Sequence, residues 1–178
     1  MPHDPSSEIR IAPIGEEHIE SFYRCLDDIA KERRYLGMIE APPIASTTEF
    51  IRSNIARNAI QLVALFGETV VGWCDIAPHD WTGFRHSGRL GMGVHAEFRR
   101  RGIGKRLAVQ AIAAAHQRGL ERVELDVYVS NRAALALYEK LGFVHEGLKK
   151  NARKLDGVYD DLLIMALFLD TAAPSVPS

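Results

Sequence analysis

The chain has few of the residues that disulfide frameworks, structural metal sites and membrane spans require. Its only cysteines are Cys25 and Cys74, and they do not form a CxxC pair. We therefore expect neither a disulfide scaffold nor a metal site. No apolar run reaches the roughly 18 residues of a membrane-spanning helix, and the first ten residues lack the apolar stretch of a secretory signal. These absences predict a cytoplasmic protein with no membrane partner.

The chain also carries almost no net charge. It has 22 Lys and Arg against 23 Asp and Glu, a formal net charge of -1. Binding to a nucleic-acid backbone needs a strong positive excess, so we expect no nucleic-acid partner. The 47% hydrophobic and 25% charged residues are typical of a soluble globular protein.

The length of 178 residues fits one domain, and no internal repeat is present. We predict a single domain over residues 8–169. The Pro/Ser-rich segment 170–178 has no large apolar side chain except Val176, so we predict that it is disordered. We expect the same of the short segment 1–7.

The spacing of apolar residues predicts alternating strands and helices. The order is one strand, two helices, three strands, a helix, a strand, a helix and two strands, which indicates an α/β (α+β) fold with a mixed sheet. The unit near residues 88–129 predicts one parallel pair of strands. The predicted strands are 8–14, 59–66, 69–77, 89–96, 122–129, 143–150 and 158–169, and the predicted helices are 16–34, 46–58, 102–118 and 131–142.

Residues 97–107, EFRRRGIGKRL, combine five basic side chains with Gly102 and Gly104, where a predicted strand gives way to a helix. The first N–H groups of a helix have no intrahelical partners and, with the helix dipole, attract anions. Glycines let an anion come close to those amides. The stretch therefore predicts a pyrophosphate cradle. Two alternatives are a charged surface loop and a dinucleotide-binding GxGxxG motif, although the third glycine position of that motif is Leu107.

A second motif follows one helix and one strand later, in VSNRAALALYEKLGF. Asn131 and Tyr138 are seven residues apart and therefore lie on one helix face, two turns apart. Taken alone, Asn131 is interpreted as a helix N-cap and Tyr138 as a core aromatic residue.

Together the two motifs resemble the GCN5-related N-acetyltransferase (GNAT) family. The resemblance covers roughly residues 8–168 and is most specific over 90–145. It implies a mixed, mostly antiparallel seven-stranded sheet that splays into a V, is flanked by four helices, and binds acetyl-CoA in the opening. The matching residues are Arg99, Gly102, Gly104, Asn131, Tyr138, Gly142 and Phe143.

The resemblance also implies roles for individual residues. The LGMGV strand would use its glycines for a bulge that frees its backbone for the pantetheine arm. The amides of the glycine loop would hold the pyrophosphate, and Tyr138 would protonate the leaving thiolate. The predicted cofactor-binding residues are Met92, Gly93, Val94, Arg99, Arg100, Arg101, Gly102, Ile103, Gly104, Lys105, Asn131 and Tyr138.

The strand before the loop lacks the glutamate that serves many family members as general base. We expect Asp75 or Glu40 in that role, while His79, His95 or a water relay stay open. The segment between the first two helices and the final hairpin would face the acceptor. The predicted substrate-binding residues are Tyr35, Glu40, Trp73 and Tyr159.

The expected function is therefore direct transfer of an acetyl group from acetyl-CoA to a primary amine, within a ternary complex. The acceptor would be a small-molecule amine or a protein N-terminus. The alternative is a non-catalytic acyl-CoA-binding sensor, because the usual strand glutamate is missing. The family resemblance also makes a homodimer possible.

Overall fold

A computed structural model describes residues 8–169, so the disorder predicted for 1–7 and 170–178 lies outside the described residues. Within this range the chain forms seven strands and four α-helices, as predicted. Their bounds are β1 Ile9–Pro13, α1 Ile19–Lys31, α2 Ile44–Ala56, β2 Ile60–Phe66, β3 Thr69–Pro78, β4 Ser87–Val94, α3 Ile103–Gln117, β5 Arg122–Tyr128, α4 Arg132–Lys140, β6 Val144–Leu155 and β7 Val158–Phe168.

The strands form one mixed sheet in the order β1-β2-β3-β4-β5-β7-β6. Every neighbouring pair is antiparallel except β4 and β5, which are parallel, as the strand–helix–strand pattern predicts. A parallel pair needs a long crossover, and α3 provides it.

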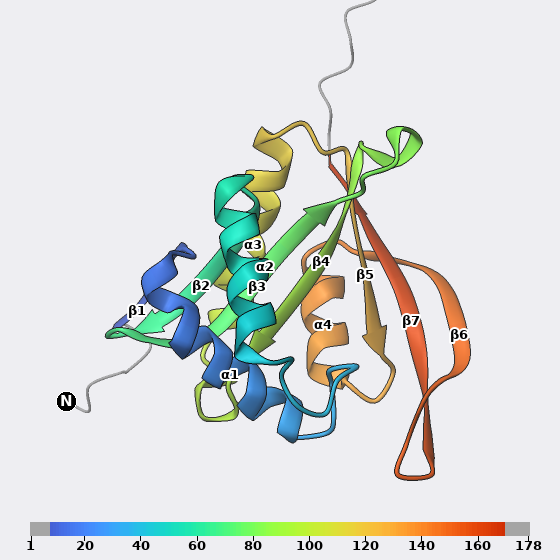
Figure 1. Cartoon of the computed structure of the whole chain (residues 1–178). Coiled ribbons are helices and arrows are strands. Elements are labelled where there is room, and N and C mark those ends of the chain that lie inside the picture. The colour runs from blue at the N-terminus through green and yellow to red at the C-terminus, as the bar shows by residue number, and fades with distance from the viewer. Residues whose placement is uncertain (1–7, 170–178) are drawn as a thin grey trace, which may run out of the picture.

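The sheet opens between β4 and β5. Only Ser87, Gly88 and Arg89 of β4 pair with β5, opposite residues 122–124. Beyond these pairs the two strands diverge, while β4 stays paired with β3 and β5 stays paired with β7 (Figure 1). The sheet therefore consists of a β1–β4 arm and a β5–β7–β6 arm, which confirms the predicted V.

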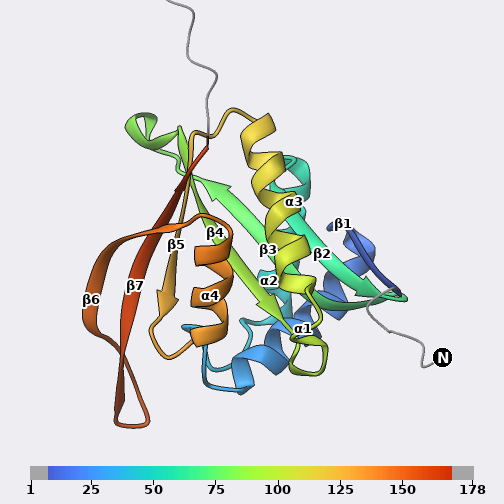
Figure 2. The same ribbon diagram turned by 180° about the vertical axis from the view of Figure 1, so that it is seen from behind.

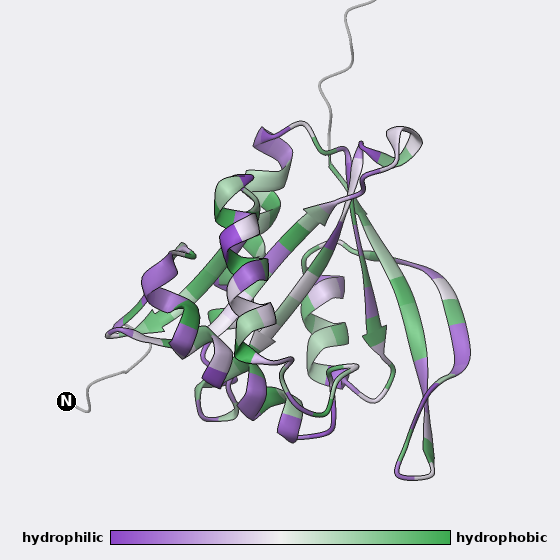
Figure 3. Ribbon diagram, viewed as in Figure 1, coloured by the Kyte–Doolittle hydropathy of each residue, from purple (hydrophilic) through white to green (hydrophobic). Residues whose placement is uncertain are grey.

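Each face of the sheet carries its own pair of helices. Helices α1 and α2 cover one face of the β1–β4 arm (Figure 1), and α3 and α4 lie on the opposite face (Figure 2). Two apolar clusters follow: one joins β2 and β3 to α1 and α2, the other joins the sheet to α3 and α4. The apolar residues accordingly gather along the strands, and the outer side of α1 is hydrophilic (Figure 3). Helices α1 and α2 do not extend over the β5–β7–β6 arm, so the helices leave this face uncovered beside the opening. It is the face on which the acceptor is expected from the sequence, and we call it the acceptor face.

The final hairpin is longer than predicted. Strand β6 continues to Leu155 and shifts register against β7 between Lys149 and Arg153. Asp156 and Gly157 both have positive φ angles, 51° and 78°, as a two-residue hairpin turn requires. The polar KNARKL segment concealed the second half of β6, since it lacks alternating apolar residues.

Candidate active site

The open edge of β4 provides backbone groups that no neighbouring strand uses. The His95 N–H donates to the carbonyl of Val71 on β3, so the preceding residue directs its own N–H and C=O away from β3. Met92 and Val94 therefore point these groups into the opening. The Val94 carbonyl already accepts a hydrogen bond from Nε of Arg99 at 2.8 Å.

The glycines of β4 make room for side chains of β3. The predicted bulge is wrong, because residues 88–94 pair with β3 in unbroken register. A Cβ on Gly93 would lie 2.4 Å from the Trp73 ring, and a Cβ on Gly91 would lie 3.3 Å from Oδ1 of Asp75. Both β3 side chains thus lean across β4 toward the opening. Trp73 is also buried against Phe22, with ring centroids 5.4 Å apart, so it forms a wall of the site.

Asp75 is a carboxyl group in a setting that suits a general base. It lies on the α1/α2 face beside Gly91, just beyond the last residues that join β4 to β5. Its side chain keeps partial solvent access, but the surrounding protein raises the pKa of its carboxyl from 3.8 to about 7 by desolvation. No hydrogen bond or ion pair to it occurs within residues 8–169. A carboxyl that titrates near neutral pH can accept a proton from an amine.

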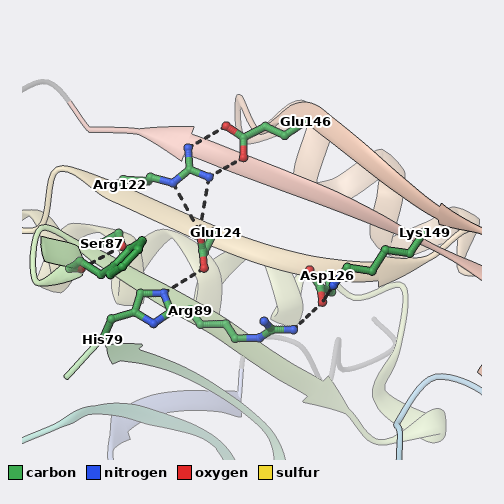
Figure 4. Close-up of polar contacts among 9 residues, drawn as sticks. His79, Ser87, Arg89, Arg122, Glu124, Asp126, Glu146 and Lys149 are labelled. Atoms are coloured by element: carbon green, nitrogen blue, oxygen red, sulfur yellow. Dashed lines mark hydrogen bonds and ion pairs between the residues drawn. The ribbon is translucent and has the colours of Figure 1, made fainter. Parts of the chain in front are cut away.

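Other carboxylates on the acceptor face are already paired (Figure 4). Glu124 on β5 contacts His79 at 2.9 Å and Arg122 at 3.3 Å. Asp126, two residues further, contacts Arg89 on β4 at 2.6 Å. This network was not predicted, because its partners come from the loop after β3 and from β4, β5 and β6 and share no motif. Asp75, in contrast, is a carboxyl beside the opening with no such partner within residues 8–169.

Tyr138 lies on the opposite face of the sheet from Asp75. Its side chain is buried, 6% exposed, and packs on Phe143 with ring centroids 5.6 Å apart. Burial raises the pKa of its phenol, and the neighbouring Cys74 on β3 contributes. Since Cys74 and Asp75 are consecutive on a strand, their side chains point to opposite faces. A phenol that stays protonated and a carboxyl with a pKa near 7 therefore lie on opposite faces of the same part of β3.

The two glycines of the loop are required for different physical reasons. Gly102 precedes α3 with a φ of 74°, so it serves the backbone conformation, and no atom crowds the place of its Cβ. At Gly104 a Cβ would lie 3.0 Å from Cε of Met92, so this glycine lets α3 approach β4. Each glycine thus has a structural reason of its own, and the role of both beside an anion stays a prediction.

The basic side chains of the loop differ in their partners. Arg99 is held by Glu32, Arg101 lies over the Phe98 ring at 5.2 Å, and Arg106 donates to the carbonyl of Ile9. Arg100 and Lys105 are exposed, and no protein partner for either occurs within residues 8–169. Ile103 is buried in the core. The charges available to an anion are therefore those of Arg100 and Lys105, together with the backbone amides.

Asn131 is the N-cap of α4. Its Oδ1 accepts a hydrogen bond from the amide of Ala134 at 3.2 Å, which leaves the side-chain NH₂ group for a ligand.

The predicted acceptor residues are only partly brought together. Tyr35 is half-buried and Glu40 is exposed in the loop between α1 and α2. Tyr159 is exposed at the hairpin tip, pairs with Lys154, and lies on the opposite face from Asp160. Two other side chains of the β5–β7–β6 arm, Arg153 and Tyr128, lie beside the loop between α1 and α2. Arg153 lies over the Tyr128 ring at 4.1 Å and donates to the carbonyl of Arg34 in that loop.

None of the described helices is long and apolar enough to cross a membrane. No group of three or more His, Cys, Asp or Glu side chains in the described part is arranged to hold a metal ion.

Known structures of the same fold match almost the whole chain. An acetyltransferase of Salmonella typhimurium solved with acetyl-CoA superposes with a TM-score of 0.86 at 19% identity, covering 95% of this chain and 99% of the other. A ribosomal-protein-alanine N-acetyltransferase of Brucella melitensis gives 0.83 at 24% identity, covering 90% and 99%.

Sequence relatives match a shorter part. A ribosomal protein bS18-alanine N-acetyltransferase of Salmonella typhimurium is 38% identical over 76 residues, which are 43% of this chain and 51% of the relative. An N-alpha-acetyltransferase of Arabidopsis thaliana is 38% identical over 85 residues, 46% of this chain and 42% of the relative. The chain thus spans about half the length of the curated relatives it matches. The acetyltransferase (GNAT) family model matches residues 19–143, most of the chain, and the protein therefore belongs to this family.

Proposed function

We propose that the protein is an N-acetyltransferase that moves the acetyl group of acetyl-CoA to the α-amino group of a protein N-terminus. The observation that carries the proposal is the pair of groups at the opening. Asp75 lies on one face with a pKa near 7, and protonated Tyr138 lies on the other. The relatives of known activity that act on alanine and other protein N-termini support this choice of acceptor. A small-molecule amine is the alternative acceptor.

The residues of the opening fit acetyl-CoA. The backbone of Met92 and Val94 offers hydrogen-bonding groups along the open edge of β4, as a pantetheine arm would use them. The amides of residues 100–105, with the side chains of Arg100 and Lys105, suit a pyrophosphate. The NH₂ group of Asn131 faces away from its cap and is free to donate. Bound acetyl-CoA supplies an activated acyl group.

Proton transfer follows from the two faces. An α-ammonium group has a pKa of about 7.7–8.0 and must lose a proton before its nitrogen can attack. Asp75 accepts that proton on the acceptor face. The N–H of Val94 points into the opening and is placed to stabilise the negative charge that develops on the thioester oxygen. As the new C–N bond forms and the C–S bond breaks, Tyr138 donates its proton to the departing thiolate.

Neither cysteine suits a covalent acyl intermediate. Burial raises the pKa of Cys25 to about 12 and that of Cys74 well above its usual value. The thiolate is the nucleophilic form of cysteine, so both side chains are inert near neutral pH. Direct transfer between two bound substrates is therefore the mechanism we propose.

The acceptor would approach over Trp73 and the loop that carries Tyr35 and Glu40. Glu40 and the other exposed carboxylates suit a cationic amine. Because Asp75 provides the carboxyl that β4 lacks, we prefer an enzyme to a non-catalytic acyl-CoA sensor.

The test is release of free CoA thiol from acetyl-CoA with matched acceptors. One peptide carries a free α-amine and no lysine, a second has a blocked N-terminus and one internal lysine, and a polyamine is the third acceptor. We expect turnover with the first peptide and its loss in Tyr138→Phe. If only the polyamine is turned over, the acceptor is a small-molecule amine and not a protein N-terminus. If CoA binds but no amine is acetylated, the non-catalytic sensor is favoured.

A further inference from the structure

Three consecutive residues at the end of α1 connect the two arms of the V. Helix α1 ends at Lys31, and Glu32, Arg33 and Arg34 follow it. Arg33 has a φ of 56°, a left-handed conformation that is uncommon for any residue but glycine. This conformation accompanies contacts of Glu32 with the β4 arm and contacts of Arg33 and Arg34 with the β6–β7 arm.

On the first arm, Glu32 holds the open edge of β4 through Arg99. The two carboxylate oxygens of Glu32 accept from Nη1 and Nη2 of Arg99 at 2.8 and 2.5 Å. Nε of the same guanidinium donates to the Val94 carbonyl at 2.8 Å. Each of the three guanidinium nitrogens thus donates one hydrogen bond, two to the carboxylate and one to the carbonyl, and both side chains are at least two-thirds buried. A two-pronged pair of this kind fixes direction as well as distance.

On the second arm, Arg33 and Arg34 contact the final hairpin. Arg33 donates to both carboxylate oxygens of Asp156, in the β6–β7 turn, at 2.7 and 3.1 Å. The carbonyl of Arg34 accepts from Arg153, which lies on the Tyr128 ring. The Arg33–Asp156 pair is exposed and adds little to stability. Its effect is therefore on where the loop lies, not on whether the chain folds.

We propose that Glu32 and Arg33 are positioning residues. Together they fix the position of the acceptor site relative to the acyl-CoA site. Glu32 acts through Arg99 on the Val94 backbone, where acyl-CoA binds, and Arg33 fixes the hairpin that borders the acceptor. Arg99 is then not a pyrophosphate ligand but the connection between the acceptor loop and the cofactor strand. This inference rests on the proposed function for its acceptor part only.

The two residues differ in the substrate that they affect. Glu32→Gln keeps the shape of the side chain but loses the charge that holds Arg99, so the Val94 carbonyl and the acceptor loop both lose their support. We expect KM for acetyl-CoA and KM for the acceptor peptide each to rise about tenfold, with kcat within about twofold. Arg33→Gln affects only the hairpin side. It should raise KM for the peptide and leave KM for acetyl-CoA unchanged.

The matched control is Glu16→Gln. Glu16 accepts from Nε and Nη2 of Arg52 at 3.2 and 3.0 Å, and this pair lies away from the opening. The Glu16–Arg52 pair is exposed, as Arg33–Asp156 is, so the Glu16→Gln variant reports the general cost of losing an exposed arginine–carboxylate pair. We expect its two KM values to match the wild type and all three variants to melt within a few degrees of it.

The proposal is overturned if Glu32→Gln changes both KM values less than twofold, or if Glu16→Gln changes them as much. It is overturned for Arg33 if both KM values move together. Calorimetry with CoA gives a readout without turnover, since Glu32→Gln should weaken CoA binding about tenfold. If the wild type binds CoA but acetylates no amine, the proposed function fails, whereas the role of Glu32 is still decided by this affinity.

Discussion

The substitution Asp75→Asn tests two consequences of burying a carboxyl beside the opening, one for the rate of the reaction and one for the stability of the fold. The substitution keeps the size of the side chain and removes its charge at every pH. As general base, Asp75 should contribute about 10²–10⁴-fold to the rate. We expect kcat/KM of the wild type to fall with decreasing pH below about 7, where the Asp75 carboxyl becomes protonated. In Asp75→Asn this fall should disappear along with most of the activity.

The same carboxyl should make the folded protein less stable as the pH rises. Its pKa increases from 3.8 to about 7 on folding, so the folded state binds the proton more tightly, by up to about 4 kcal/mol. The folded state holds this proton between pH 4 and 7 and the unfolded state does not. Stability from this group is therefore complete below pH 4 and is lost as the pH rises through 7. Asp75→Asn escapes the loss.

Two measurements test this reasoning. Urea denaturation of both proteins at pH 4.5, 6 and 8 should show the variant gaining on the wild type, by up to about 4 kcal/mol at pH 8. The pH profile of kcat/KM should be repeated with an acceptor whose amine pKa differs. A limb of the profile that shifts with the acceptor reports the amine, and a limb that stays in place reports the enzyme carboxyl. Asp126→Asn is the control. If it abolishes the limb near pH 7 while Asp75→Asn keeps it, the paired carboxylate is the base and the reasoning from burial is refuted.

Three further substitutions test other parts of the site. Tyr138→Phe should lower kcat about 100-fold with little change in either KM, and an unchanged kcat would rule out its role as proton donor. Gly104→Val should displace Met92 and weaken CoA binding in calorimetry, whereas Gly102→Ala should mainly lower thermal stability, by about 1 kcal/mol. Asn131→Ala should lose about 1 kcal/mol of cap stability and some CoA affinity; in Asn131→Asp the melting temperature should recover but the affinity should not.

The sequence predicted the fold well, because the fold depends on local patterns. The apolar spacing in α1 and α3, the β-branched residues of β5 and the Asp156–Gly157 turn each specify their own element. The second half of β6 escaped prediction because its polar residues and register shift carry no alternating signal.

The site was predictable only where a motif carries it. Asn131 and the glycine loop follow from short-range spacing and lie where the pattern predicts. The Asp75 side chain lies over Gly91 because of the register between β3 and β4, and no local sequence pattern predicts that register. The same holds for Glu32 and Arg99, which are 67 residues apart in the sequence. Long-range contacts of single charged residues leave no periodic trace.

The short parallel seam also has a mechanical consequence. Backbone pairing joins the two halves of the sheet at three residue pairs only, whereas β3 with β4 and β5 with β7 each pair over seven. The rest of the connection between the arms comes from side chains: the apolar cluster under α3 and α4 spans both arms, and Arg33 and Arg34 contact the final hairpin. If acetyl-CoA and the acceptor bind on the two sides of the opening as proposed, its width sets the distance between amine and thioester. Side-chain contacts between the arms would then contribute to the rate although they touch neither substrate.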